Sequence, residues 1–222
     1  MGTRPAESAQ ARRGLDVMSA ENKQIATTAR RHDDMKVVLI GDSIRMGYQQ
    51  LVAQKCHGAE VWGPTQNCRH SLWALDHFQE WVAAQEPDLI HVNFGIHDAS
   101  LQPDGDHQII LPQYRLCLRR FIDKVKELRK PKMIWATTTP LYASEPGKPM
   151  AQWPIKEGAE IATYNAAALE IAQSEGLPVN DLHNAIVCND FTKCLKEDGC
   201  HMTEFGNDVL ADAVVKAIGA LM

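Results

Sequence analysis

The sequence predicts an α/β fold in three layers, α/β/α, with a five-stranded parallel sheet in the middle. Two observations lead to this prediction. Short apolar runs of strand length alternate with helix-length segments from residue 36 to the end of the chain. The clearest run, residues 36–41, is apolar throughout rather than on every second residue, which is typical of a strand buried on both faces. Such alternation implies a parallel sheet that is covered by helices on both faces.

Five strands are expected, at residues 36–41, 59–62, 88–93, 132–137 and 177–180. The first is rich in Val and Ile and ends at Gly41. Pro87 separates the third strand from the helix before it, and Pro140 closes the fourth strand. Gly176 is the expected stop of the helix that precedes the fifth strand.

Five helices are expected between and after these strands, at residues 44–55, 71–84, 111–130, 161–175 and 203–221. The third is long and amphipathic, with apolar residues at helical spacing on one face. Two long polar connections, residues 98–112 and 142–158, are the natural walls of a substrate cleft above the sheet.

Length and charge limit the possible classes. The 222 residues are 45% hydrophobic and 23% charged, and the formal net charge is −5. We expect one domain, residues 35–222, preceded by a disordered tail, residues 1–34, that has no aromatic residue and few large aliphatic ones. The mild acidity disfavours a nucleic-acid partner. No apolar run is long enough to span a membrane and no signal peptide is evident, so we expect a cytoplasmic protein, with export left open.

Six cysteines occur without any Cys-x-x-Cys pair, so the pattern does not indicate a zinc site. Cys188, Cys194 and Cys200 lie six residues apart, which would permit a bridge among them in an exported protein. Free thiols are the favoured interpretation.

Three polar segments contain the residues with catalytic chemistry. Gly41-Asp42-Ser43 directly follows the first strand, where a serine would lie at a helix N-terminus. Residues 95–98, Gly-Ile-His-Asp, follow the third strand. Residues 198–201, Asp-Gly-Cys-His, precede the last helix, and an Asp three residues before a His can orient the imidazole as a general base for the serine. Each segment alone also fits a helix cap or a polar loop, but together and in this order they indicate a serine hydrolase.

With these three segments the chain resembles the SGNH hydrolases, the GDSL-type esterases and lipases, from about residue 36 to residue 222. Within that family it is most similar to a bacterial subgroup with Gly-x-His-Asp in place of Gly-x-Asn-Asp. The resemblance implies the flavodoxin-like SGNH fold, and a triad in which Ser43 is the nucleophile, His201 the general base and Asp198 its orienting partner. It also implies that neither a cofactor nor a metal is required.

Two departures concern the oxyanion hole, to which the resemblance assigns the backbone N–H of Ser43. The family asparagine of the third segment is replaced by His97, whose neutral ring still carries one N–H. The subgroup's Asn-Cys-Gly appears as Asn67-Cys68-Arg69, so a non-glycine residue holds a position whose backbone N–H usually donates. Arg69 could still donate if its φ angle suits, and the amide of Asn67 is a further candidate donor.

The expected substrate is a small acyl ester, most plausibly an O-acetyl group on a carbohydrate. Asp42, Asp98 and Trp153 are candidate substrate-binding residues, and Arg45, Arg69 and His70 are either further contacts or solvated side chains. Two alternatives stay open: a lysophospholipase or thioesterase with a longer acyl pocket, and a catalytically silent member that binds glycans or partners. A nucleotide- or flavin-binding protein would share the strand–helix alternation, but the chain has no phosphate-binding glycine motif. The sequence does not predict an oligomeric state.

Overall fold

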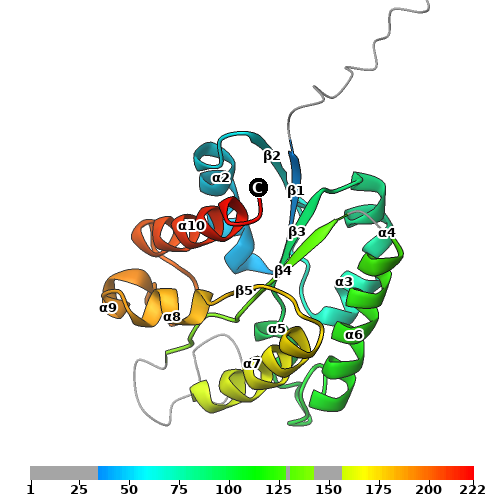
Figure 1. Ribbon diagram of the computed structural model, residues 1–222. Coiled ribbons are helices and arrows are strands. Elements are labelled where there is room, and N and C mark those ends of the chain that lie inside the picture. The colour runs from blue at the N-terminus through cyan, green and yellow to red at the C-terminus, as the bar shows by residue number, and fades with distance from the viewer. Residues whose placement is uncertain (1–34, 129–130, 143–156) are drawn as a thin grey trace, which may run out of the picture. The chain divides into compact units, whose positions relative to one another are not determined.

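The computed structural model describes residues 35–128, 131–142 and 157–222. Its centre is a sheet of five parallel strands in the order β2-β1-β3-β4-β5 (Figure 1). The strands are β1 (Met35–Ile40), β2 (Ala59–Trp62), β3 (Leu89–Val92), β4 (Lys132–Ala136) and β5 (Val179–Asn180). The predicted α/β fold and all five predicted strands are therefore confirmed, whereas the tail expected at residues 1–34 lies outside the described residues.

Helices cover both faces of the sheet. On one face α2 (Ser43–Lys55) packs against α10 (Glu204–Gly219), which also contacts α8 (Leu182–Val187) and α9 (Phe191–Cys194). On the other face α6 (Leu111–Glu127) lies between α3 (Ser71–Asp76) and α7 (Glu157–Ser174) (Figure 1). The side chains of the central strands are buried on both sides as a result: Val37, Val38, Leu39, Leu89 and Ile90 are all fully buried. Each such side chain contributes about 1.5–3 kcal/mol through burial.

The predicted helix at residues 71–84 is divided in the structure into α3, α4 (Phe78–Trp81) and the 3-10 turn η1 (Ala83–Gln85). The break falls at His77, whose ring lies 4.3 Å from the ring of Trp73 and 4.3 Å from the ring of Trp81. The apolar spacing seen in the sequence persists across this break, so the pattern could not show it. The short helices α5 (Ile96–Ala99), α8 and α9 lie in segments for which the sequence predicted no helix.

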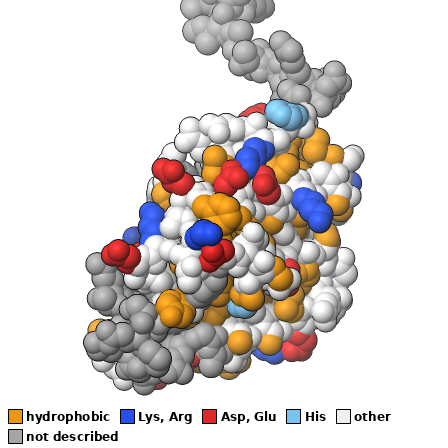
Figure 2. Space-filling model, turned by 90° about the vertical axis from the view of Figure 1, so that its left-hand side faces the viewer, with side chains coloured by type: hydrophobic (Ala, Val, Ile, Leu, Met, Phe, Trp, Pro, Cys, Tyr) orange, Lys and Arg blue, Asp and Glu red, His pale blue; other side chains and the backbone are white. Residues whose placement is uncertain are grey.

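Charges of both signs are interspersed on the surface. Figure 2 shows acidic and basic side chains next to one another on one face. Between α2 and α10, Lys55 contacts the carboxylates of Asp208 and Asp212 at 2.5 and 2.7 Å. None of the helices in the described part of the chain has the length and apolar character that a membrane crossing requires. The six cysteines are free thiols, five of them buried, as the sequence favoured.

Parallel topology brings the ends of distant segments together. Val37 to Ile40 pair with Leu89 to Val92, so β1 and β3 end at the same edge of the sheet. Ser43 follows β1 and His97 follows β3, each within a few residues of its strand end. The carboxyl edge of the sheet is therefore where the candidate residues meet, as expected for this topology.

Candidate active site

Ser43 is the first residue of α2. Asp42 caps this helix, and its Oδ1 accepts a hydrogen bond from the N–H of Ile44 at 2.9 Å. The backbone N–H groups of a first helical turn have no partner within the helix, and the helix dipole favours negative charge there. The N–H of Ser43 thus lies where it can stabilise charge that develops on an oxygen bound beside its own hydroxyl.

Three side chains form a continuous hydrogen-bonded chain at this position. Ser43 Oγ lies 2.9 Å from His201 Nε2, and His201 Nδ1 lies 2.7 Å from Asp198 Oδ2. Ser43 comes from the start of α2, whereas Asp198 and His201 belong to the loop before α10. The spacing fits the role of each residue: an imidazole held by a carboxylate at one nitrogen can accept the serine proton at the other.

The loop of residues 198–201 holds His201 through its own backbone. Asp198 Oδ1 accepts hydrogen bonds from the N–H groups of Cys200 and His201, both at 2.9 Å. Burial raises the pKa of Asp198, but these backbone hydrogen bonds and the bond from His201 outweigh it, so the net pKa is below its usual value. Asp198 is therefore an anion at neutral pH, and it can stabilise a protonated His201.

The side chains of Asn67 and His97, two of the candidate oxyanion-hole residues, lie next to each other. Asn67 Nδ2 lies 3.4 Å from His97 Nε2. Burial lowers the pKa of His97, although the nearby carboxylate of Asp42 opposes the shift, so the ring is neutral at pH 7. With its proton on Nδ1 the ring accepts from Asn67. With its proton on Nε2 it presents a second N–H donor next to the amide of Asn67.

Arg69 differs from its predicted role. Its backbone N–H donates to Asn67 Oδ1 at 2.7 Å, so this donor already has an acceptor within the loop. The bond instead fixes the Asn67 amide with its NH₂ group toward His97. Arg69 has a φ of 52°, a left-handed conformation that costs a residue with a Cβ roughly 1–2 kcal/mol. Its guanidinium lies 5.0 Å from the ring centre of Trp73, a contact worth about 0.5–1 kcal/mol at an exposed site.

Asp42 and Asp98 were predicted to bind substrate, and the structure places both side chains in the interior. Asp42 is 1% exposed and serves as the cap of α2. Asp98 is fully buried and accepts hydrogen bonds from both the N–H and the hydroxyl of Ser71. Burial raises the pKa of Asp98 to about 7, despite the opposing bonds from Ser71. Asp42 therefore caps its own helix, whereas Asp98 holds the segment after β3 against the start of α3.

Trp153, His70 and Arg45 were the remaining candidates for contact with the substrate. Trp153 lies outside the described residues. His70 caps α3 through its Nδ1, which accepts from the N–H of Trp73 at 3.1 Å. Arg45 is 1% exposed and is thus neither a solvated side chain nor a substrate contact. Arginine is seldom buried, and nothing in the local sequence pattern indicated that this one would be.

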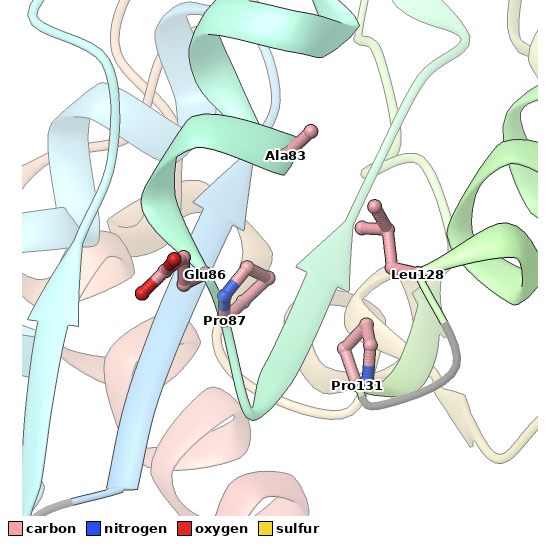
Figure 3. A pocket seen from close by; sticks show the side chains of 5 residues that line it. All are labelled: Ala83, Glu86, Pro87, Leu128 and Pro131. Carbon is pink, nitrogen blue, oxygen red and sulfur yellow. The ribbon is translucent and has the colours of Figure 1, made fainter.

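One hollow of the surface lies away from the candidate catalytic residues. It has a volume of about 330 Å³ and is lined by Ala83, Glu86, Pro87, Leu128 and Pro131 (Figure 3). Pro87 and Pro131 precede β3 and β4, so the hollow lies at the amino edge of the sheet, opposite to Ser43 and His97. Within residues 35–128, 131–142 and 157–222, no group of three or more His, Cys, Asp or Glu side chains is arranged to hold a metal ion.

Comparison with known proteins identifies the family and agrees with the fold. The family model described as GDSL-like Lipase/Acylhydrolase matches residues 39–209. Among solved structures, a lipase/acylhydrolase from Enterococcus faecalis is similar, with a TM-score of 0.68 and 22% identity, over 84% of this chain and 96% of that chain. A GDSL-like lipase from Bacteroides thetaiotaomicron has a TM-score of 0.69 and 20% identity, over 93% and 98%. A search of curated proteins gave no significant match.

An acetylxylan esterase from Geobacillus stearothermophilus, solved as a catalytic mutant, is similar at a TM-score of 0.66 and 20% identity, over 84% of this chain and 95% of that chain. At these identities the structural matches establish the fold, while the family match covers well over half of the sequence. The chain therefore belongs to the GDSL-like lipase/acylhydrolase family and is an ester hydrolase with the SGNH fold.

Proposed function

We propose that the protein is a serine esterase that removes a small acyl group, an O-acetyl group on a carbohydrate, through Ser43, His201 and Asp198. The observation that carries the proposal is the continuous chain from Ser43 Oγ to His201 Nε2 at 2.9 Å and from His201 Nδ1 to Asp198 Oδ2 at 2.7 Å. A serine hydroxyl is a weak nucleophile at neutral pH, and a hydrogen-bonded imidazole is what activates it.

The reaction follows from this arrangement in two steps. Ser43 Oγ attacks the ester carbonyl carbon as His201 Nε2 takes its proton, and the resulting oxyanion binds the N–H of Ser43 and the donors at Asn67 and His97. His201 then gives the proton to the leaving alcohol, which departs and leaves an acyl group on Ser43. A water molecule, deprotonated by His201, attacks the acyl carbon. Collapse of the second oxyanion breaks the bond to Ser43 Oγ, which takes the proton back from His201, so the carboxylic acid is released and both residues return to their starting states.

Two observations support this choice of residues and of acyl group. Two similar structures are of an acetylxylan esterase from Geobacillus stearothermophilus in which a serine or a histidine is replaced by alanine, and both are called catalytic mutants. Another similar structure, at a TM-score of 0.69, is named an acetyl xylan esterase. These names describe those proteins, and they make an acetylated saccharide the first substrate to test here.

A chain-length series tests the proposal. Hydrolysis of p-nitrophenyl esters from C2 to C12 should be fastest for acetate, and acetylated xylo-oligosaccharides should release acetate. Ser43→Ala should reduce the rate by about 10⁴-fold or more, because the nucleophile is lost. A maximum at C8 or longer would indicate a lysophospholipase or thioesterase instead. If a fluorophosphonate probe fails to label the folded wild type, the protein is a silent binding member.

A further inference from the structure

Arg45 occupies an unusual position for a charged residue. It lies on α2 two residues after Ser43, and its side chain is 1% exposed. Burying a guanidinium is costly unless its donors are satisfied, so its partners indicate what the residue is for. The established family and the proposed triad do not assign it a role.

The guanidinium of Arg45 binds mainly backbone carbonyl oxygens from two loops. Nε and Nη2 both donate to the carbonyl of Gly41 at 3.2 Å, in the turn that leads from β1 to Ser43. Nη1 donates to the carbonyl of Pro64 and Nη2 to the carbonyl of Gln66, both at 2.6 Å, in the loop after β2. Nη1 also donates to Gln49 Oε1, which completes the planar fork.

Arg45 contacts the residue on either side of Asn67. Gln66 precedes it, and its carbonyl is held by Arg45. Cys68 follows it, with its Sγ 3.6 Å from Arg45 Nη2 and its N–H donated to the carbonyl of Gly41 at 3.2 Å. The loop segment 64–68 is thereby joined to the turn that carries Ser43, and the amide of Asn67 is directed from this segment toward His97.

Gly41 allows this arrangement because the stem of Arg45 passes directly over it. A Cβ at position 41 would lie 2.8 Å from the Cβ of Arg45 and 3.3 Å from its Cγ. Gly41 and Arg45, which lies in the first turn of α2, therefore fit each other sterically. A smaller residue at position 45 would leave the carbonyls of Gly41, Pro64 and Gln66 without these donors.

We propose that Arg45 is a positioning residue that holds the loop carrying Asn67 against the turn carrying Ser43, so that the oxyanion donors stay aligned with the nucleophile. The catalytic consequence rests on the proposed serine esterase function, whereas the anchoring of the loop does not. A displacement of donors by about 1 Å costs on the order of 100-fold in rate, so the effect should be large.

Arg45→Lys tests the proposal, because lysine keeps the charge but cannot form the planar fork. We expect kcat for p-nitrophenyl acetate to fall about 100-fold with little change in KM. Affinity for a trifluoromethyl ketone, which forms an oxyanion on the serine, should fall in parallel. Backbone hydrogen exchange in residues 63–70 should become faster at a temperature where the rest of the domain stays protected.

Two variants of the same helix serve as controls. Val52→Ala removes buried apolar atoms and should lower Tm while leaving kcat near that of the wild type below the unfolding transition. Tyr48→Phe removes a buried hydroxyl and should leave kcat unchanged. The proposal is overturned if Arg45→Lys keeps the kcat of these controls, or if exchange in residues 63–70 is unchanged. If Ser43→Ala still hydrolyses the ester, the proposed function fails, and the exchange measurement alone decides whether Arg45 anchors the loop.

Discussion

At the scale of single residues, His97 is the most informative departure from the family pattern that the chain resembles. Its Nε2 lies 3.4 Å from Asn67 Nδ2, and its burial favours the neutral ring. A neutral imidazole with its proton on Nε2 supplies one N–H, which is what an asparagine amide would supply at this place. We therefore propose that His97 replaces the family asparagine as the donor of one hydrogen bond to an oxyanion.

His97→Asn should therefore keep kcat for p-nitrophenyl acetate within about tenfold of the wild type, whereas His97→Leu should lose about 10²–10³-fold, the usual cost of one oxyanion donor. Steady-state kinetics of the two variants at pH 8 measures the difference. His57→Asn, at an exposed histidine, is the control and should have no effect. Equal losses in His97→Asn and His97→Leu would show that His97 acts in a way an amide cannot replace.

At the scale of elements, the short helix α5 depends on close contact with the end of β4. A Cβ on Gly95 would lie 2.1 Å from Thr138 Oγ1 and 3.1 Å from Thr138 Cβ. Thr138 cannot easily give way, because its hydroxyl donates to the carbonyl of Phe94 and Asn165 binds both its N–H and its carbonyl. The glycine thus sets the distance at which His97 and Asp98 stand from the neighbouring strand.

Gly95→Ala should reduce the free energy of unfolding by about 1–3 kcal/mol, the usual cost of overpacking, and should also reduce kcat because His97 moves with α5. Gly219→Ala is the matched control, since nothing lies within 4 Å of a Cβ there and the residue ends α10. Urea denaturation and steady-state kinetics on both variants check the prediction. An unchanged stability in Gly95→Ala would mean that neither the contact with Thr138 nor the φ of 156° at Gly95 constrains this position.

At the scale of the whole molecule, the two helical layers and the sheet bury charged groups that link stability to pH. Asp98 is fully buried beneath α3, with Ser71 as its hydrogen-bond partner, and burial raises its pKa to about 7 from the 3.8 that is usual for an exposed aspartate. Because folding favours the protonated form, this group's contribution to stability is fully present below pH 3.8. It is lost as the pH rises through about 7.

Asp98→Asn removes this dependence. The unfolding free energy of the wild type should fall relative to that of Asp98→Asn between pH 5 and pH 8, by at most about 1.4 kcal/mol per pH unit. Urea denaturation of both proteins at several pH values provides the comparison, and Asp104→Asn, at an exposed position, is the control. A difference between wild type and Asp98→Asn that stays constant over this range would refute the assigned shift.

The sequence alone determined the α/β fold, the five strands and the three segments that carry Ser43, His97 and His201. It could do so because apolar strand runs and a hydrolase motif depend on local order along the chain. It did not predict the burial of Asp42 and Asp98, because a carboxylate in a motif looks the same whether it faces a cleft or lies in the interior. Burial is set by segments far apart in sequence, such as Ser71 against Asp98.

Only the tertiary structure decided where the donors point. In the structure the N–H of Arg69 donates a hydrogen bond to the side-chain oxygen of Asn67, and the amide nitrogen of Asn67 lies next to His97. The structure also encloses Arg45 among the carbonyls of two loops. Most of these contacts join residues that are far apart along the chain: Asn67 and His97 are 30 positions apart, and Arg45 is 19 and 21 positions from Pro64 and Gln66. They exist because parallel strands end at one edge of the sheet, so that loops distant in the chain must satisfy one another's polar groups there.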